Sequence, residues 1–193
     1  MTKDKILEAA LALFAKNGYE GTSLAEIAKT VGIQKPSIYN HFKSKEEIFL
    51  TIYENILLFH VQKIKNIMDS IKELSAKEKL NQILTVTFQY YIEFEDQSSF
   101  LNRAMVFPPE LLKEQLHNQF FRSEEEMSDI LRSIIKAGME KGEIRKGNIE
   151  DFIMSFYCLI DGIFIELSFY GVEKMKPRIE NIWKNFWCGI KND

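Results

Sequence analysis

Residues 22–47 read TSLAEIAKTVGIQKPSIYNHFKSKEE, and this stretch decides the fold. Ser23 and Glu26 stand three residues apart, the spacing of a capping box, which predicts the start of a helix. Gly32 is expected to end that helix, because glycine adopts the left-handed backbone at little cost. Pro36 suits the first turn of a second short helix, where proline is tolerated. The stretch therefore predicts two short helices joined by a tight turn.

The two helices have the spacing of a helix-turn-helix, a motif that places its second helix in the major groove of DNA. Ala28 is small where the helices must cross closely, and an earlier helical stripe from Ile6 to Phe14 supplies a third helix. The segment from Lys29 to Lys45 holds four lysines and no carboxylate, which suits an approach to phosphates. The apolar positions expected to form a shared miniature core are Ile27, Val31, Ile33 and Ile38. Two packed helices of an ordinary all-α protein are the alternative interpretation.

The motif resembles the DNA-binding domain of the TetR (TetR/AcrR) family of bacterial regulators, over roughly residues 3–50. The resemblance rests on residues 22–28, on Gly32-Ile33 and on the run from Ser37 to Glu47. It implies an all-α fold, with an N-terminal three-helix DNA-binding domain over residues 1–50 joined to a helical ligand-binding and dimerisation domain over residues 51–193. In one departure, Gln34 stands where many members have a Ser or Thr that caps the recognition helix.

The resemblance also implies which residues contact DNA. The residues expected to do so are Thr22, Ser23, Lys35, Pro36, Ser37, Tyr39, Asn40, His41 and Lys45. Those at 35–37 would open the recognition helix towards the major groove, and Tyr39 and His41 would reach phosphates or base edges. Lys45 and the pair at 22–23 would hold phosphates at helix N-termini. A structural, hydrogen-bonding role is the alternative for His41, and Phe42 is expected to pack the module together.

Beyond the motif, the sequence predicts further helices. Ser44 and Glu47 form a second capping box, which opens a long helix to about Met68 and runs without a linker into the rest of the chain. Sparse glycine and proline favour long helices. The helices expected after it span residues 76–95, 98–106, 109–121, 123–141, 148–170 and 173–189.

The last two predicted helices are apolar on more than one face and so need more than one partner. They resemble the helix pair through which the family forms a four-helix dimer interface, and Gly162 would permit a close approach. The residues expected in a homodimer interface are Ile160, Ile163, Leu167, Tyr170, Trp183, Phe186 and Trp187. Such a dimer would bind a pseudo-palindromic double-stranded DNA operator.

The aromatic residues of the larger domain predict a pocket for a small-molecule inducer, although most of them are expected to be core. The expected lining residues are Phe88, Tyr91, Ile92, Arg103, Met105, Phe107, Phe120, Phe156 and Tyr157. Acidic side chains at 93, 95, 96 and 161 would suit a lipophilic cation, whereas Arg103 would suit an anion such as an acyl-CoA. The sequence leaves both open.

Composition limits the other functional classes. The net charge of −3 belongs mainly to residues 51–193, because residues 1–50 carry seven lysines against six carboxylates. We therefore expect weak non-specific DNA binding. Three histidines and two cysteines lie far apart, and no Gly-rich phosphate loop appears, so we expect no metal, no cofactor and no enzyme. Cys158 and Cys188 are expected to be buried, reduced thiols.

The function predicted from the sequence is therefore a cytoplasmic, sequence-specific repressor that a small lipophilic ligand releases from its operator. No signal peptide and no membrane span are expected. A transcriptional activator of the same fold is the alternative within this class. A helical protein-interaction module that does not bind DNA is the alternative outside it.

Overall fold

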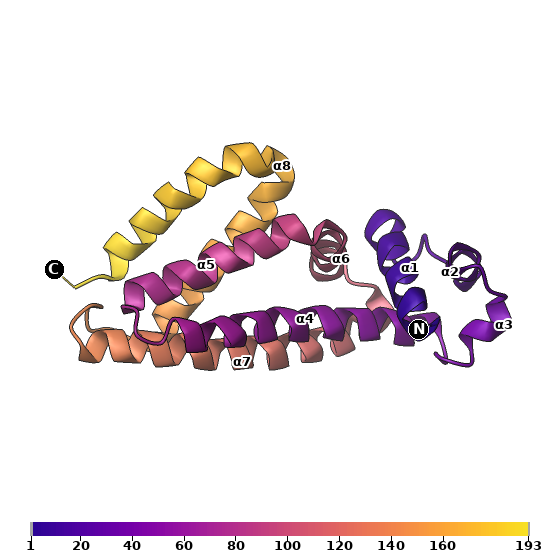
Figure 1. Ribbon diagram of the computed structural model, residues 1–193, viewed down its shortest axis with the longest axis horizontal. Coiled ribbons are helices and arrows are strands. Elements are labelled where there is room, and N and C mark those ends of the chain that lie inside the picture. Colours follow the sequence, from indigo (N-terminus) through magenta and orange to yellow (C-terminus); the bar gives the residue numbers. More distant parts are fainter. Residues whose placement is uncertain (1, 193) are drawn as a thin grey trace. The chain divides into compact units, whose positions relative to one another are not determined.

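The computed structural model describes residues 2–192 (Figure 1). Within that range the chain is helical, apart from connecting segments and one isolated antiparallel bridge between Ile144 and Lys191. The helices are α1 (Thr2–Asn17), α2 (Leu24–Val31), α3 (Lys35–Ile38), α4 (Lys45–Ser70), α5 (Ala76–Glu93), α6 (Glu95–Val106), the 3₁₀ turn η1 (Glu110–Leu112), α7 (Lys113–Glu140) and α8 (Ile149–Ile190). The expected all-α fold class is confirmed.

The helices form two compact units. The first unit contains the chain up to Phe59 together with Phe94–Ser123, and the second contains His60–Glu93 together with the chain from Glu124 onward. The first unit thus holds α1 to α3, α4 as far as Phe59, α6, η1 and the beginning of α7. The division of function at residue 50 that the motif suggests stays a prediction.

Aromatic rings hold the first unit together. Phe14 of α1 and Phe49 of α4 pack edge to face, with ring centroids 5.0 Å apart. Phe100 of α6 lies 4.7 Å from Phe49, so α6 belongs to the same core as the N-terminal helices. All three side chains are buried. Because aromatic pairs of this geometry add stability beyond their buried area, this cluster fixes α6 against α1 and α4.

The second unit is built from longer helices. One predicted helix break is absent there, and another is present. Residues 113–140 form one continuous α7, so the predicted helices 109–121 and 123–141 were wrong. No proline or glycine interrupts residues 113–137, and the backbone therefore continues. The predicted break after residue 170 is confirmed, because Gly171 has φ 71° and ψ 167° inside α8. Figure 1 shows the two halves of α8 folding back at this point.

The first half of α8 is apolar on both its buried and its exposed side. Ile153, Phe156 and Ile163 lie in the core of the second unit. Met154, Ile165 and Phe169 are exposed on the same segment, with Phe169 81% exposed. By length and composition alone α8 could cross a membrane, which is weak evidence for a helix that also forms a core. Cys158 and Cys188 are exposed, so the expectation of buried thiols was wrong.

Candidate nucleic-acid interface

The turn between α2 and α3 has the geometry that the sequence predicts. Ser23 is the N-cap of α2: its backbone N–H donates to the Glu26 carboxylate at 2.8 Å, and Glu26 N donates to Ser23 Oγ at 3.2 Å. The Ser23 hydroxyl also donates to this carboxylate at 2.8 Å, and this bond together with the one from the Ser23 backbone N–H lowers the pKa of Glu26. Gly32 ends the helix with φ 77°, and Ile33 N donates across the turn to Ala28 O at 3.0 Å. The capping box and the glycine turn are therefore confirmed.

The segment from Lys35 to Phe42, hereafter the recognition segment, is helical only over its first four residues. α3 ends at Ile38, and Gln34 caps it without a side-chain hydrogen bond. The chain then continues in turns, with Phe42 N donating to Ile38 O at 3.0 Å. Ile38 is 0% exposed and Phe42 is 1% exposed, which confirms that Phe42 packs the module. Two buried anchors thus hold a segment whose other side faces outward.

The outward side of this segment carries donors and cations. Tyr39 is 52% exposed, and Asn40 and His41 between the two anchors are also exposed. Lys35 and Pro36 at the start of α3 are exposed, while Ser37 is half-buried. Two further exposed lysines, at positions 29 and 43, flank the segment. Such a surface offers cations to phosphates and short polar groups to base edges.

Two residues expected to hold phosphates are instead bonded inside the protein. Thr22 is 2% exposed, and its hydroxyl donates to Gly18 O at 2.9 Å. Lys45 Nζ donates to Tyr19 O at 2.8 Å and to Thr22 O at 3.1 Å, and it lies 3.9 Å from the centroid of the Tyr19 ring. Their side chains therefore fix the loop before α2 to the start of α4, and their expected phosphate contacts stay a prediction.

The same loop makes one more contact with α4. Tyr19 Oη donates to Glu46 Oε1 at 2.7 Å, and burial together with this carboxylate raises the pKa of Tyr19. At the start of α4, Glu47 N donates to Ser44 Oγ at 3.3 Å. The Glu47 carboxylate accepts from Lys43 N rather than from Ser44 N. The second predicted helix start is thus confirmed, with one partner shifted by a residue.

The residues expected to line a pocket belong to both units. In the second unit Phe88 and Phe156 are buried, and Tyr91, Ile92 and Tyr157 are half-buried. Tyr157 Oη donates to Glu124 O at 3.0 Å and lies 2.8 Å from Ser128 Oγ. The first unit contains Arg103, Met105, Phe107 and Phe120. Of these, Arg103 bonds to backbone carbonyls of α1, and Phe107 is 80% exposed.

The residues expected at a subunit interface differ in their exposure. Ile160, Ile163 and Trp183 are at most 9% exposed and lie in the core of the second unit, so their expected place in an interface stays a prediction. Leu167, Phe186 and Trp187 are half-buried, and Tyr170 is 42% exposed beneath the Arg178 guanidinium. The sequence analysis missed Met154, Ile165 and Phe169. Their helical spacing in a stripe that also includes Cys158 was the signal that could have found them.

Within residues 2–192, no group of three or more His, Cys, Asp or Glu side chains could hold a metal ion.

Comparisons with known proteins agree with the helix-turn-helix geometry of α2 and α3. The family model for bacterial regulatory proteins of the TetR family matches residues 6–52.

Two relatives and one solved structure show how far this similarity extends. The chain is 26% identical over 161 residues to the HTH-type transcriptional regulator YerO of Bacillus subtilis, covering 83% of this chain but only about half, 53%, of that relative. It is 25% identical over 183 residues to IcaR of Staphylococcus aureus, an HTH-type negative regulator of the biofilm operon icaADBC, covering 93% of both. The structure of FadR from Bacillus subtilis with stearoyl-CoA matches in fold, with a TM-score of 0.80 at 22% identity and coverage of 97% and 98%.

Proposed function

This chain belongs to the TetR family of bacterial regulatory proteins, and we propose that it is a cytoplasmic repressor. It binds a pseudo-palindromic operator as a homodimer, and it leaves the operator when a small apolar ligand binds its helical C-terminal part. IcaR is a negative regulator by name, and it aligns with this chain over 93% of both sequences. That relationship favours repression over activation.

The exposed face of the recognition segment is the observation that carries this proposal. Ile38 and Phe42 are buried on one side, while Tyr39, Asn40 and His41 are exposed on the other. A segment held in this way presents a fixed set of donors, so contact with DNA requires little reorganisation. Helix-turn-helix proteins use this arrangement to read base edges in the major groove.

The exposed apolar stripe of α8 supports a homodimer. Ile165 is 47% exposed and Phe169 is 81% exposed, and both lie on one segment with Met154. An apolar stripe of this kind usually marks a site of protein association. Gly162 lies on the same segment, and a Cβ added there would meet nothing within 4 Å, so a second helix has room to approach. Two subunits joined here would present two recognition segments to a symmetric operator.

The proposed ligand has an apolar body, and its proposed binding site lies in the second unit. The Tyr91 and Phe164 rings lie 4.6 Å apart, centroid to centroid, and the Tyr157 hydroxyl sits among buried apolar side chains. Binding pockets combine apolar walls with a few polar groups in this way. The structure of FadR contains stearoyl-CoA, which makes this compound a suitable first probe. Ligand binding would shift the population of the dimer towards a form that fits the operator poorly.

Fluorescence anisotropy tests the proposal. A labelled duplex from the region upstream of the protein's own gene is compared with a shuffled duplex at about 0.2 M salt, where non-specific binding of few phosphates is weak. We expect the upstream duplex to bind at least about 1000-fold more tightly than the shuffled one. Stearoyl-CoA, but not free CoA, should release it. Equal affinity for both duplexes would contradict the proposal.

Sedimentation velocity tests the dimer separately. The double variant Ile165→Glu/Phe169→Glu should sediment as a monomer at micromolar concentration, because four carboxylates would face each other across the interface. Leu111→Glu is the matched control, since Leu111 is 69% exposed on η1 in the first unit. The control should stay dimeric. A monomeric wild type, or a dimeric double variant, would contradict the proposed interface.

A further inference from the structure

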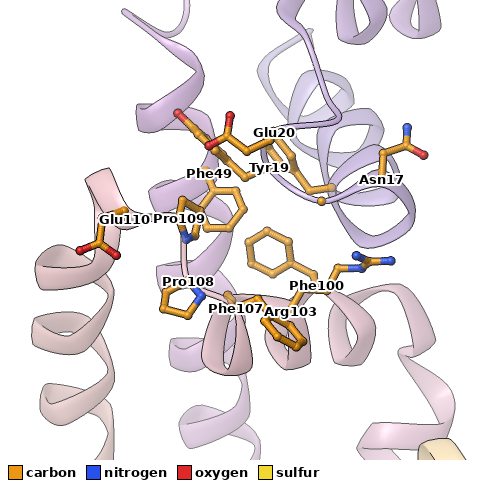
Figure 2. A pocket seen from close by; sticks show the side chains of 13 residues that line it. Asn17, Tyr19, Glu20, Phe49, Phe100, Arg103, Phe107, Pro108, Pro109 and Glu110 are labelled. Carbon is orange, nitrogen blue, oxygen red and sulfur yellow. The ribbon is translucent and has the colours of Figure 1, made fainter.

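Arg103 holds the C-terminal end of α1. From the last turn of α6, its Nε donates to Ala15 O at 2.8 Å and its Nη2 donates to Lys16 O at 3.1 Å. The carbonyls of a last helical turn lack partners within the helix and carry the negative end of its dipole. A guanidinium that donates to two of them is therefore a strong, directional link. Figure 2 shows Arg103 extending from α6 towards the turn that carries Asn17.

A second contact, of apolar character, lies one turn earlier on α6. Phe100 is 1% exposed, and its ring lies 4.7 Å from Phe49 and 6.3 Å from Phe14, centroid to centroid. This ring anchors the middle of α6 to α1 and α4. Arg103 adds the contact at the end of α1, so the two side chains together leave α1 little freedom to tilt relative to α6.

A cavity beside Arg103 increases the importance of its hydrogen bonds. The cavity has a volume of about 370 Å³, and Figure 2 shows the side chains around it. Its lining includes Asn17 at the end of α1, Gly18 directly after it, and Phe100, Arg103 and Ala104 of α6. Side chains that border a void lose packing contacts on that side. The Arg103 hydrogen bonds therefore hold this end of α1 on the side where the cavity leaves it without apolar contacts, while Phe14 packs on the other side.

The position of α6 in the chain connects the Arg103 contact to the second unit. Phe94 is the single residue between α5 and α6, and α5 belongs to the second unit. α5 carries Tyr91, one of the residues proposed to bind the ligand. On the other side, α1 packs against α2, which begins the helix-turn-helix. A displacement of the end of α5 would thus reach α6 through one residue and α1 through Arg103.

We infer that Arg103 is a positioning residue for operator binding. It sets the orientation of α1, and through α1 that of α2 and α3, while contacting neither DNA nor ligand. The inference rests on the proposed function, because it takes operator binding as the property that Arg103 supports. It also changes the role that the sequence suggested, since the guanidinium is bonded to the protein backbone rather than available to an anionic ligand.

Operator titrations of full-length Arg103 variants test the inference. Arg103→Ala should bind the upstream duplex about tenfold more weakly than wild type, because the end of α1 loses both hydrogen bonds that set its orientation and part of that loss reaches operator binding. Arg103→Lys should lose less, about threefold, because one ammonium can still donate to a carbonyl. The slope of log Kd against log salt concentration should not change, since no phosphate contact is removed. The matched control is Arg122→Ala. In the wild type, Arg122 Nε donates to Asn118 O within the same helix.

Each result decides between this role and the others. A wild-type affinity in Arg103→Ala would overturn the inference, as would a slope smaller by about one, which would indicate a phosphate contact. A lower fraction of active protein with an unchanged Kd would indicate a purely structural role and would also overturn it. If Arg103→Ala does not fold, Arg103→Lys carries the test with the same readouts. Failure of the wild type to prefer the operator would contradict the proposed function, and this inference with it.

Discussion

The two compact units of this protein differ in how their sequences specify them. The first unit uses short helices, such as α2 with 8 residues and α3 with 4, each started or ended by a local signal. The second unit uses long helices, and its α8 has 42 residues with one glycine break. The recognition segment of the first unit presents lysines and polar donors to solvent, while α8 of the second unit presents an apolar stripe. Local signals thus suffice for the surface proposed to read DNA, whereas a core that is also proposed to meet a ligand and a partner subunit depends on distant contacts.

Core truncations in each unit give the largest expected effects. Phe156 is 0% exposed with its ring 5.5 Å from that of Phe186, and Phe156→Ala should lower the free energy of unfolding by about 4 kcal/mol. Ile38 is also 0% exposed, but it lies in a smaller core, and Ile38→Ala should cost about 3 kcal/mol. Urea titrations measure both values.

Operator affinity should rank the same two variants in the opposite order. Ile38→Ala removes an anchor of the recognition segment, so it should weaken operator binding more than Phe156→Ala when both proteins are folded. Anisotropy at low temperature, corrected for the folded fraction, makes the comparison. If Phe156→Ala weakened operator binding as much as Ile38→Ala, operator binding would not depend on the first unit more than on the second.

A pH dependence of stability is expected from a half-buried histidine of the second unit. His60 Nε2 lies 3.2 Å from Thr87 Oγ1, and burial, reinforced by the charge of Lys63, lowers the pKa of His60 to about 4. An unfolded histidine has a pKa of about 6.5, so between pH 6.5 and 4 the unfolded chain binds more protons. The free energy of unfolding should therefore fall as the pH falls, by about 3 kcal/mol at pH 4.

The variant His60→Gln should remove this part of the pH dependence, as measured by urea unfolding at several pH values. The matched control is His41→Gln, which changes an exposed side chain of the first unit. The control should keep the wild-type slope between pH 6.5 and 4. A wild-type slope in His60→Gln would show that carboxylates alone cause the loss.

Two glycines of the second unit, Gly138 and Gly162, differ in the space around them. A Cβ added at Gly138 of α7 would lie 2.7 Å from Ala76 Cβ and 2.8 Å from Ile144 Cδ1, so Gly138→Ala should cost about 2 kcal/mol. A Cβ at Gly162 would meet nothing within 4 Å, and Gly162→Ala should gain about 1 kcal/mol from helix propensity. Thermal unfolding in the Ile165→Glu/Phe169→Glu background keeps subunit contacts out of the measurement. Effects of the same sign would contradict this account of their surroundings.

The first unit was the more predictable one. Ser23, Gly32 and Phe42 behave as the sequence indicates, because capping boxes, left-handed glycines and short apolar spacings act within a few residues. The roles of Thr22 and Lys45 could not be predicted in the same way. Their partners include the backbone carbonyls of Gly18 and Tyr19, and a carbonyl acceptor leaves no trace in the sequence.

In the second unit the helices were predictable but their surfaces were not. The break at Gly171 follows from a single residue, whereas the continuity of α7 depends on the absence of any strong stop signal. Both apolar faces of α8 look alike in sequence, so nothing marked Ile163 as core and Phe169 as exposed. Only packing against the other helices separates them.

The salt dependence of operator binding tests the central claim most directly, which is that the exposed face of the recognition segment contacts DNA. Lys35→Ala is compared with Lys77→Ala, a change of an exposed lysine on α5, using the upstream duplex at several salt concentrations. We predict that Lys35→Ala binds about tenfold more weakly, with a slope of log Kd against log salt reduced by about one per contacting subunit, while Lys77→Ala matches wild type. Equal affinities and equal slopes for wild type and both variants would contradict the claim.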